Sequence, residues 1–218
     1  MNIVLLGSPA SGKGTQAEIL SQKFSLFHLS TGDVARKLSE TDPRIREIVT
    51  SGKLVPPEEM TMHVLDFLEN EKTDLKDILF EGFPRFVSQY EALDNFLKSK
   101  GDDIDVVISL EVPMEVAVKR ISSRWMCSKC GEIYNTETKP SEKSGICDKC
   151  GSPLVQRDDD KPDSVKTRFE YYVKNTKELI DYVDGKGKLT RVNGDRSIDD
   201  IAGDLESIVR KASKDDHN

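Results

Sequence analysis

The sequence predicts an α/β fold in which a parallel, doubly wound sheet lies between two layers of helices. Short apolar runs that read as strands alternate along the chain with longer stretches of helical periodicity, the pattern of strands joined by crossover helices. The run DVVISLE at 105–111 is almost continuously apolar, as a strand buried on both faces requires. The chain has 218 residues, enough for one such three-layer core with small insertions.

The first half of the chain alternates short apolar runs with amphipathic stretches and contains one irregular segment. That segment, 31–60, is expected to form two or three small helices, because Pro43, Gly52 and the pair Pro56–Pro57 interrupt it. The regular elements expected here are strands at 2–6, 26–30 and 77–82 and helices at 14–24 and 88–100.

The second half repeats the pattern around another irregular segment. Pro113 is expected to open a helix that runs to about Arg124. Residues 127–160 lose their hydrophobic periodicity, so both irregular segments are interpreted as insertions into the core. The other elements expected here are a helical stripe of Val165, Phe169, Tyr172, Thr176 and Leu179, a strand at 189–192, a helix at 198–211 and a frayed tail to 218.

Composition excludes several classes of protein. The net charge is −7, whereas a nucleic-acid-binding protein is more often basic or carries a basic stripe, so no nucleic-acid partner is expected. No run of about 18 apolar residues occurs, so no transmembrane helix or membrane association is expected. The amino-terminal residues lack the basic and apolar regions of a signal peptide, which favours a cytoplasmic location.

A phosphate-binding loop follows the first expected strand. Gly7, Gly12 and Lys13 fit the pattern G-x-x-x-x-G-K-[ST], except that Gly14 follows the lysine and the hydroxyl comes one residue later, at Thr15. Glycines let successive backbone N–H groups converge on phosphate oxygens, and the next helix points its positive end at them. The order strand, loop, helix favours a nucleotide site over a plain glycine-rich turn.

The loop alone does not choose the reaction. The Asn-Lys-x-Asp motif that a GTPase uses to read its base is absent. The strand that would end in an acidic pair in a motor or transporter ATPase ends here in FEGFPR, residues 80–85.

Five short motifs together resemble the adenylate kinase family, in the subtype with a zinc-bearing LID. They are GSPASGKGT (7–15), STGD (30–33), GKLV (52–55), EGFPR (81–85) and RDDD (157–160), in this order. The resemblance covers residues 1 to about 211 and implies a fold like that of the P-loop NTPases. It implies a core of 1–29, 61–121 and 161–218, an AMP-binding lobe at 30–60 and a LID at 122–160.

The resemblance also implies the site residues. Those expected to bind ATP are Ala10, Ser11, Gly12, Lys13, Gly14, Thr15, Arg120, Arg124, Ile133, Tyr134 and Arg196. Those expected to bind AMP are Thr31, Arg36, Lys53, Leu54, Val55, Gly82, Phe83, Pro84, Arg85, Gln89, Arg157 and Arg168. The residues expected to act in catalysis are Lys13, Arg85, Arg120, Arg124, Arg157 and Arg168.

The implied reaction is Mg·ATP + AMP ⇌ 2 ADP, carried out by a monomer or a small oligomer. Phosphoryl transfer needs positioning and charge stabilisation more than a covalent nucleophile, and arginine meets phosphate oxygens bidentately. Arg120 and Arg124 are expected four apart on one helix, where an anion between them would offset their repulsion. The alternative for Arg120 and Arg124 is that both are solvated on the helix surface. The alternative for Arg157 is that it lies beside an acidic surface loop with no role in binding.

The choice of nucleotide base depends on one residue, and two other residues depart from the family pattern. Gln89 stands four residues after the arginine of GFPR, where the family reads adenine; kinases of UMP, CMP or GMP remain alternatives. Glu81 replaces the more usual Asp, which can change the geometry of the magnesium–water network. Asp158 stands where a basic residue is common, which changes the local charge balance.

The four cysteines form two C-x2-C pairs separated by sixteen residues. Cys127, Cys130, Cys147 and Cys150 can supply four thiolates to one tetrahedral zinc ion with a structural role. Gly131 and Gly151 follow the second cysteine of each pair, where such turns need positive φ. Disulfides or iron at the same sulfurs are the alternatives, as is a zinc ribbon that binds nucleic acid on an ATPase core.

Overall fold

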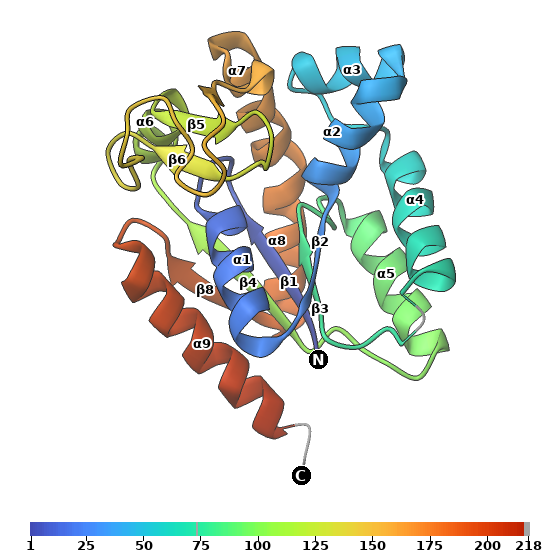
Figure 1. The fold of residues 1–218 in the computed structure, drawn as a ribbon. Coiled ribbons are helices and arrows are strands. Elements are labelled where there is room, and N and C mark those ends of the chain that lie inside the picture. Colours follow the sequence, from blue (N-terminus) through green and yellow to red (C-terminus); the bar gives the residue numbers. More distant parts are fainter. Residues whose placement is uncertain (73, 216–218) are drawn as a thin grey trace.

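Five parallel strands form the central sheet, in the order β2-β3-β1-β4-β8. The computed structural model describes residues 1–72 and 74–215. The strands are β1 (Asn2–Gly7), β2 (Phe27–Ser30), β3 (Ile78–Glu81), β4 (Val106–Glu111) and β8 (Leu189–Asn193). The parallel α/β fold expected from the sequence is therefore confirmed (Figure 1).

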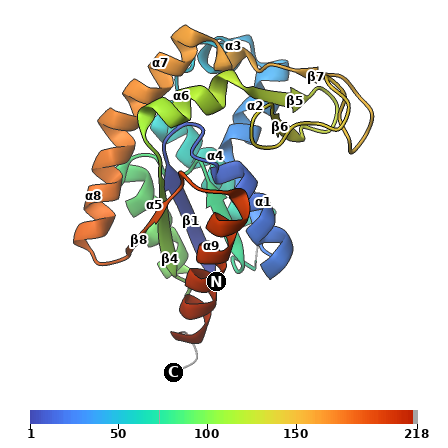
Figure 2. The ribbon, with the colours of Figure 1, turned by 90° about the vertical axis from the view of Figure 1, so that its left-hand side faces the viewer.

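Helices cover both faces of this sheet, as Figures 1 and 2 show. On one face, apolar side chains of α1 and α9 pack with Ile3 and Leu5 of β1; on the other, those of α4, α5 and α8 pack with Val4 and Leu6. Alternate residues of β1 thus face opposite helical layers, and every residue of the strand is buried. The helices are α1 (Lys13–Phe24), α4 (Pro57–Asn70), α5 (Val87–Ser99), α8 (Lys177–Gly185) and α9 (Ile198–Asp215).

Two smaller groups of elements sit at the carboxyl ends of the strands. The first follows β2 and consists of α2 (Thr31–Thr41) and α3 (Pro43–Thr50). The second is a three-stranded antiparallel sheet in the order β6-β5-β7, which projects to one side of the core in Figure 2. Its strands are β5 (Arg124–Cys127), β6 (Ile133–Asn135) and β7 (Leu154–Val155).

Two packed helices, α6 and α7, flank the second group in the sequence. Ala117 and Ile121 of α6 (Met114–Ser122) pack against Val165 and Phe169 of α7 (Pro162–Tyr171). A short 3-10 turn, η1 (Asp158–Asp160), precedes α7, and the π-helical turn η2 (Tyr172–Thr176) joins α7 to α8. The stripe expected from Val165 to Leu179 faces the interior, which confirms the periodicity seen in the sequence.

Two expected boundaries were wrong. The helix opened by Pro113 ends at Ser122, so Arg124 does not share a helix with Arg120 and instead begins β5. Hydroxyl groups of Ser122 and Ser123 donate to the Lys119 carbonyl at 2.9 and 2.5 Å and help to close the helix there. The last helix continues to Asp215 rather than fraying from 211, and 216–218 lie outside the described residues.

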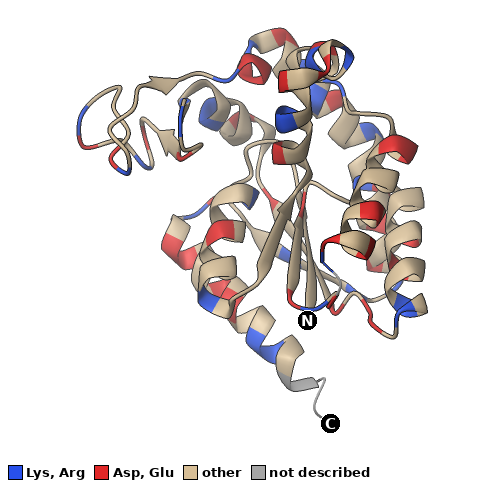
Figure 3. Cartoon of the chain, turned by 45° about the vertical axis from the view of Figure 1, so that its right-hand side comes forward, with Lys and Arg blue, Asp and Glu red and all other residues tan. Residues whose placement is uncertain are grey.

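Among the described residues, no helix is both long and apolar enough to cross a membrane. Figure 3 shows Lys and Arg interspersed with Asp and Glu along the helices and the loops around β5–β7, while the central strands are almost free of charge. The net charge is −7, and the side in view carries no continuous basic stripe of the kind that nucleic-acid-binding proteins use.

The core predicts a large cost for truncating a central strand. Leu79 in β3 is 0% exposed and packs in the cluster beneath α1, so Leu79→Ala should lower the free energy of unfolding by about 2–5 kcal/mol. Val173 is 57% exposed, so Val173→Ala should change it by less than about 0.5 kcal/mol. Urea unfolding measures both, and equal losses in the two variants would contradict the burial pattern.

Candidate active site

The phosphate-binding loop connects β1 to the first turn of α1. Gly7 has φ +145°, and a Cβ there would lie 2.4 Å from the Leu110 carbonyl oxygen of the neighbouring strand, so only glycine fits. Gly12, with φ +97°, occupies the N-cap position of α1, and no side chain caps this helix end. The backbone N–H groups of the loop and the helix dipole are therefore available to an anion.

Lys13 folds back over this loop. Its ammonium group donates to the carbonyl oxygens of Gly7 and Ser8 at 2.8 and 2.6 Å and to the Ser11 hydroxyl at 3.3 Å. Burial lowers the pKa of Lys13 to about 7; Glu81 opposes this effect, and the positive charges of Arg85, Arg168 and Arg124 add to it. The charged form of Lys13 thus lacks a sufficient counter-charge, which an anion in the loop would supply.

Glu81 ends β3 beside the loop and remains ionised. Burial alone would raise its pKa, but the Lys13 charge, the Ser30 hydroxyl and Arg85 together hold that pKa below its ordinary value. Ser30 donates to the Glu81 carboxylate at 2.9 Å and also accepts from the Asp33 N–H at the start of α2. A glutamate at this position therefore lies against the phosphate loop as a fixed negative charge.

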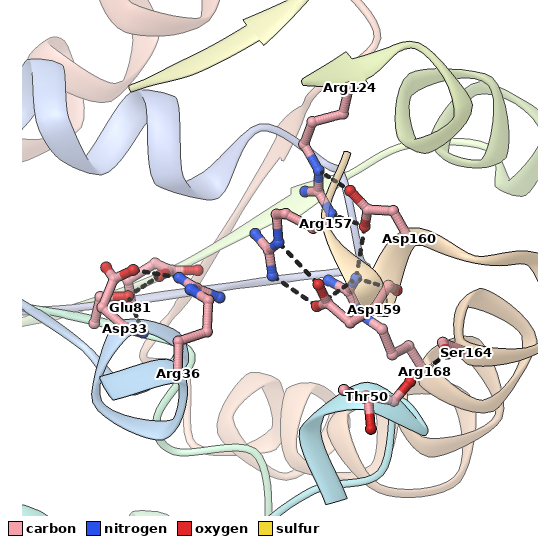
Figure 4. A network of polar contacts seen from close by, with 11 residues as sticks. Asp33, Arg36, Thr50, Glu81, Arg124, Arg157, Asp159, Asp160, Ser164 and Arg168 are labelled. Carbon is pink, nitrogen blue, oxygen red and sulfur yellow. Dashed lines mark hydrogen bonds and ion pairs between the residues drawn. The ribbon is translucent and has the colours of Figure 1, made fainter. Parts of the chain in front are cut away.

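Three arginines from different elements converge on two carboxylates (Figure 4). Arg157 holds Asp159 bidentately, with N–O distances of 2.9 and 2.6 Å. Arg124 donates to both oxygens of Asp160, and Arg168 contacts Asp159 and Asp160 at 3.0 and 3.1 Å. The structure thus brings Arg124, Arg157 and Arg168 together, and the acidic run is no plain surface loop, since Asp159 is 9% exposed.

The charges in this network perturb one another strongly. Burial lowers the pKa of Arg168 to about 10, partly offset by Asp159. Burial would raise the pKa of Asp159, but Arg157 and Arg168 lower it to about 2. The charges of Arg168 and Arg124 also act on Lys13 and add to the burial that lowers its pKa.

On the other side of the loop, the turn after β3 orients Arg85. The Arg85 guanidinium donates to the Gly82 carbonyl at 2.7 Å, and a Cβ on Gly82 would lie 2.9 Å from the Thr31 hydroxyl, so this turn lies against the start of α2. The Phe83–Pro84 peptide is cis, and both residues are buried. Arg36 pairs with Asp33 on α2, and its charge reaches Arg85.

Gln89 is 3% exposed, and both ends of its amide are engaged. Its oxygen accepts from the Arg85 N–H at 2.8 Å, and its nitrogen donates to the Pro57 carbonyl at 3.1 Å. These partners fix which end of the amide is oxygen, and each end can still form one further hydrogen bond. Val55 is buried nearby in the segment after α3, whereas Lys53 is exposed.

Of the remaining residues expected to bind ATP, Arg120 and Arg196 lie near the phosphate loop, whereas Ile133 and Tyr134 lie in the β5–β7 sheet. Arg120 reaches the Ser11 carbonyl at 3.5 Å and Asp195 at 3.9 Å, and Gly194 packs against the Ser11 carbonyl, so 194–196 borders the phosphate loop. The Arg196 side chain points to Asn193 and Asp204. Ile133 and Tyr134 belong to β6, where the Tyr134 side chain is buried in the cysteine cluster, so contact of that side chain with a nucleotide is not part of this arrangement.

The four cysteines form one cluster of free thiols whose sulfur atoms all lie within 4.8 Å of one another. Cys127 and Cys150 are 3.4 Å apart and Cys130 and Cys147 are 3.6 Å apart, too far for disulfides and close to the roughly 3.8 Å edge of a zinc–thiolate tetrahedron. Gly131 and Gly151 have φ +74° and +72°, as the knuckle turns require. The donor set therefore fits zinc.

The site also contains groups that the sequence did not single out. Asp160, shared by Arg124 and Arg168, and Ser30, which fixes Glu81, were not expected as individual partners. The only available signal was the run DDD after Arg157 and the S-T-G-D motif. Neither motif states which carboxylate meets which arginine, because the partners come from distant elements.

The network predicts a pH-dependent stability contribution from Asp159. Its folded pKa of about 2 lies below the ordinary 3.8, so the stabilisation is complete above pH 4 and is lost as pH falls toward 2. Asp159→Asn should therefore cost about 2 kcal/mol or more at pH 7, with a difference from wild type that shrinks below pH 4.

The neighbouring Asp158 provides a matched control for this prediction. It is 69% exposed and pairs only with Lys161 among the contacts described, so Asp158→Asn should cost less than about 1 kcal/mol at any pH. Denaturant unfolding of both variants at pH 7 and pH 3 gives the comparison. A pH-independent loss in Asp159→Asn would contradict the depressed pKa.

Comparison with known proteins agrees with this geometry. A sequence model of the adenylate kinase family matches residues 5–188. Curated adenylate kinases from Fervidobacterium nodosum, Caldicellulosiruptor bescii and Archaeoglobus fulgidus are 40%, 43% and 40% identical to the chain, covering 96%, 94% and 97% of it and 97%, 97% and 99% of their own lengths. With a phosphate loop, converging arginines and near full-length similarity, the chain belongs to the adenylate kinase family.

Proposed function

We propose that this member of the adenylate kinase family catalyses Mg·ATP + AMP ⇌ 2 ADP with Lys13 and the arginines as its charge-stabilising groups. The observation that carries this proposal is that Arg85, Arg124 and Arg168 all lie near enough to Lys13 for their charges to add to the burial that lowers its pKa to about 7. Phosphoryl transfer requires such positive charge around the group in flight.

The two nucleotides would approach from opposite sides of this space. ATP would place its phosphates in the loop from Ala10 to Thr15, beside Arg120 and Arg124, with the backbone of Arg196 near the adenine. Ile133 and the Tyr134 backbone would lie on the side of the LID, 122–160. AMP would lie against the lobe formed by 30–60, with its phosphate near Arg36 and Arg85. Support comes from the turn at Gly82, which lies against Thr31, and from the Arg36 charge that reaches Arg85.

The chain itself supplies no covalent intermediate in this scheme. Lys13 would exchange its carbonyl partners for phosphate oxygens, and Arg157 and Arg168 would exchange Asp159 for the transferring group and its acceptor. Water must be excluded while the phosphoryl group moves, which the lobe and the LID would achieve by closing over the site. Because one chain supplies all these groups, we propose that a monomer is active.

Two metals belong to this proposal. Magnesium would enter with ATP and neutralise phosphate charge, and the Thr15 hydroxyl and the ionised Glu81 carboxylate are the groups that would hold it. Zinc would be held by the four cysteines and fix the fold of the LID. Such reduced thiols match a cytoplasmic location.

A coupled assay of ADP formation from ATP with AMP, UMP, CMP or GMP tests the function. AMP should be the preferred acceptor, and Lys13→Ala should lower kcat by orders of magnitude with little change in unfolding temperature. Lys211→Ala, on the far part of α9, should leave the rate unchanged. A folded Lys13→Ala protein with near-normal turnover would exclude the proposed chemistry.

The base-reading role of Gln89 predicts an asymmetric effect. Gln89→Ala should raise KM for AMP by about tenfold or more and KM for ATP much less, because the amide borders only the AMP side. Gln22→Ala on the exposed side of α1 serves as the control. An equal rise in both constants, or no rise, would reject the role.

Removal of zinc should destabilise the LID without altering the core. A structural zinc site contributes about 10 kcal/mol of local folding free energy, and the β5–β7 sheet has only a small apolar cluster of its own. A chelator should therefore increase hydrogen exchange across 127–160 well before exchange in β1 or β4, while AMP binding persists. Full activity with no bound metal, or unchanged LID protection with activity lost, would contradict a structural role.

A further inference from the structure

One hydrogen bond joins the segment expected to bind AMP to the helix that carries Arg168. The Ser164 hydroxyl donates to the Thr50 carbonyl at 2.6 Å, across 114 residues of sequence. Figures 1 and 4 show α3 beside the start of α7, with Ser164 next to Thr50. Ser164 is 6% exposed, so water does not replace this contact easily.

The backbone on the α3 side is shaped for this close approach. Gly52, two residues after α3 ends, has φ +74°, and a Cβ there would lie 2.4 Å from the Ser164 carbonyl oxygen and 2.9 Å from its Cα. The N–H groups of Gly52 and Lys53 donate back to Val49 and Ile48 at 3.0 and 3.1 Å, which fixes the turn. Only glycine lets this turn lie directly on the α7 backbone.

Both sides of the contact lead directly to groups of the proposed active site. Lys53, Leu54 and Val55, expected to contact AMP, follow Gly52 without a break. Arg168 lies one helical turn after Ser164 on α7, and it binds Asp159 and Asp160 in the arginine network. The turn at Gly52 and the helix α7, which carries Arg168, should therefore move together.

We propose that Ser164, with Gly52 beside it, is a positioning residue that couples AMP binding to the placement of Arg168 and of the arginines that share Asp159 and Asp160 with it. This inference rests on the proposed function. When AMP draws the segment 50–55 into place, the Thr50 carbonyl and the Gly52 turn hold the first turn of α7 in the orientation in which Arg168 faces the phosphate loop. By linkage, a nucleotide that orders the arginines favours the AMP-binding arrangement to the same degree.

The size of the effect follows from the strength of one hydrogen bond. A net intramolecular hydrogen bond changes an equilibrium constant by about two- to tenfold. Ser164→Ala should therefore reduce by that factor the improvement in AMP affinity caused by a non-hydrolysable ATP analogue. Ser164→Thr keeps the hydroxyl and should retain the wild-type coupling. Gly52→Ala forces the two backbones apart and should abolish the coupling.

Isothermal titration of AMP, with and without the saturating β,γ-imido analogue of ATP, measures the coupling factor in each variant. Gly187→Ala is the matched control, because Gly187 has φ +70° but open space around its Cβ, so it reproduces the backbone strain without the clash. Unfolding temperatures identify purely structural losses. If Gly52→Ala does not fold, the coupling factors of Ser164→Ala and Ser164→Thr still test the inference.

The expected result is a reduced coupling factor in Ser164→Ala and restoration in Ser164→Thr, with AMP affinity in the absence of the analogue less affected. Wild-type coupling in Ser164→Ala, or equal effects of Gly52→Ala and Gly187→Ala, would overturn the inference. So would a wild-type protein without any coupling. Failure of the proposed function itself would look different, because wild-type protein would then form no ADP from ATP and AMP.

Discussion

The site depends on one electrostatic constraint: several cations are gathered around a space that the protein's own carboxylates do not fully neutralise. The consequence is visible at Lys13, whose burial beside Arg85, Arg124 and Arg168 lowers its pKa to about 7. Such an arrangement is costly without an anion and favourable with one, because desolvated charges interact strongly. The surrounding fold fixes the positions of these charged side chains.

The sheet and the carboxylates share that task. The parallel order β2-β3-β1-β4-β8 puts the ends of β1, β2 and β3 side by side, so the phosphate loop, Ser30 and Glu81 meet although 74 positions separate Gly7 from Glu81. Asp159 and Asp160 hold Arg124, Arg157 and Arg168 by hydrogen bonds. Phosphate oxygens can then replace carboxylate oxygens with little reordering of side chains, which limits the entropic cost of binding.

Sequence alone predicted the layers of the fold and supplied the candidate site residues, but not how their side chains pair. Glycines and Lys13 in the loop, the C-x2-C pairs and the apolar stripe from Val165 to Leu179 are local signals, and local physics fixes them. The sequence did not predict the end of α6, because Arg124 stands four residues after Arg120 whether or not the helix continues. The helix ends before Arg124 because residues 124–127 pair as strand β5 with β6 and β7. The partners of Arg124, Gln89 and Ser164 come from tertiary contacts that no spacing encodes.

Proton uptake on ATP binding tests the electrostatic constraint most directly. Calorimetry at pH 8 in buffers of different ionisation enthalpy counts the protons taken up when the non-hydrolysable ATP analogue binds with magnesium. With a pKa of about 7, Lys13 is largely neutral in the free protein at pH 8, and the phosphates should restore its charge, so about one proton should be taken up per site. The uptake should vanish in Lys13→Arg, whose guanidinium is always charged. Binding without proton uptake at pH 8, or equal uptake in both proteins, would contradict a Lys13 that lacks its counter-charge until phosphate arrives.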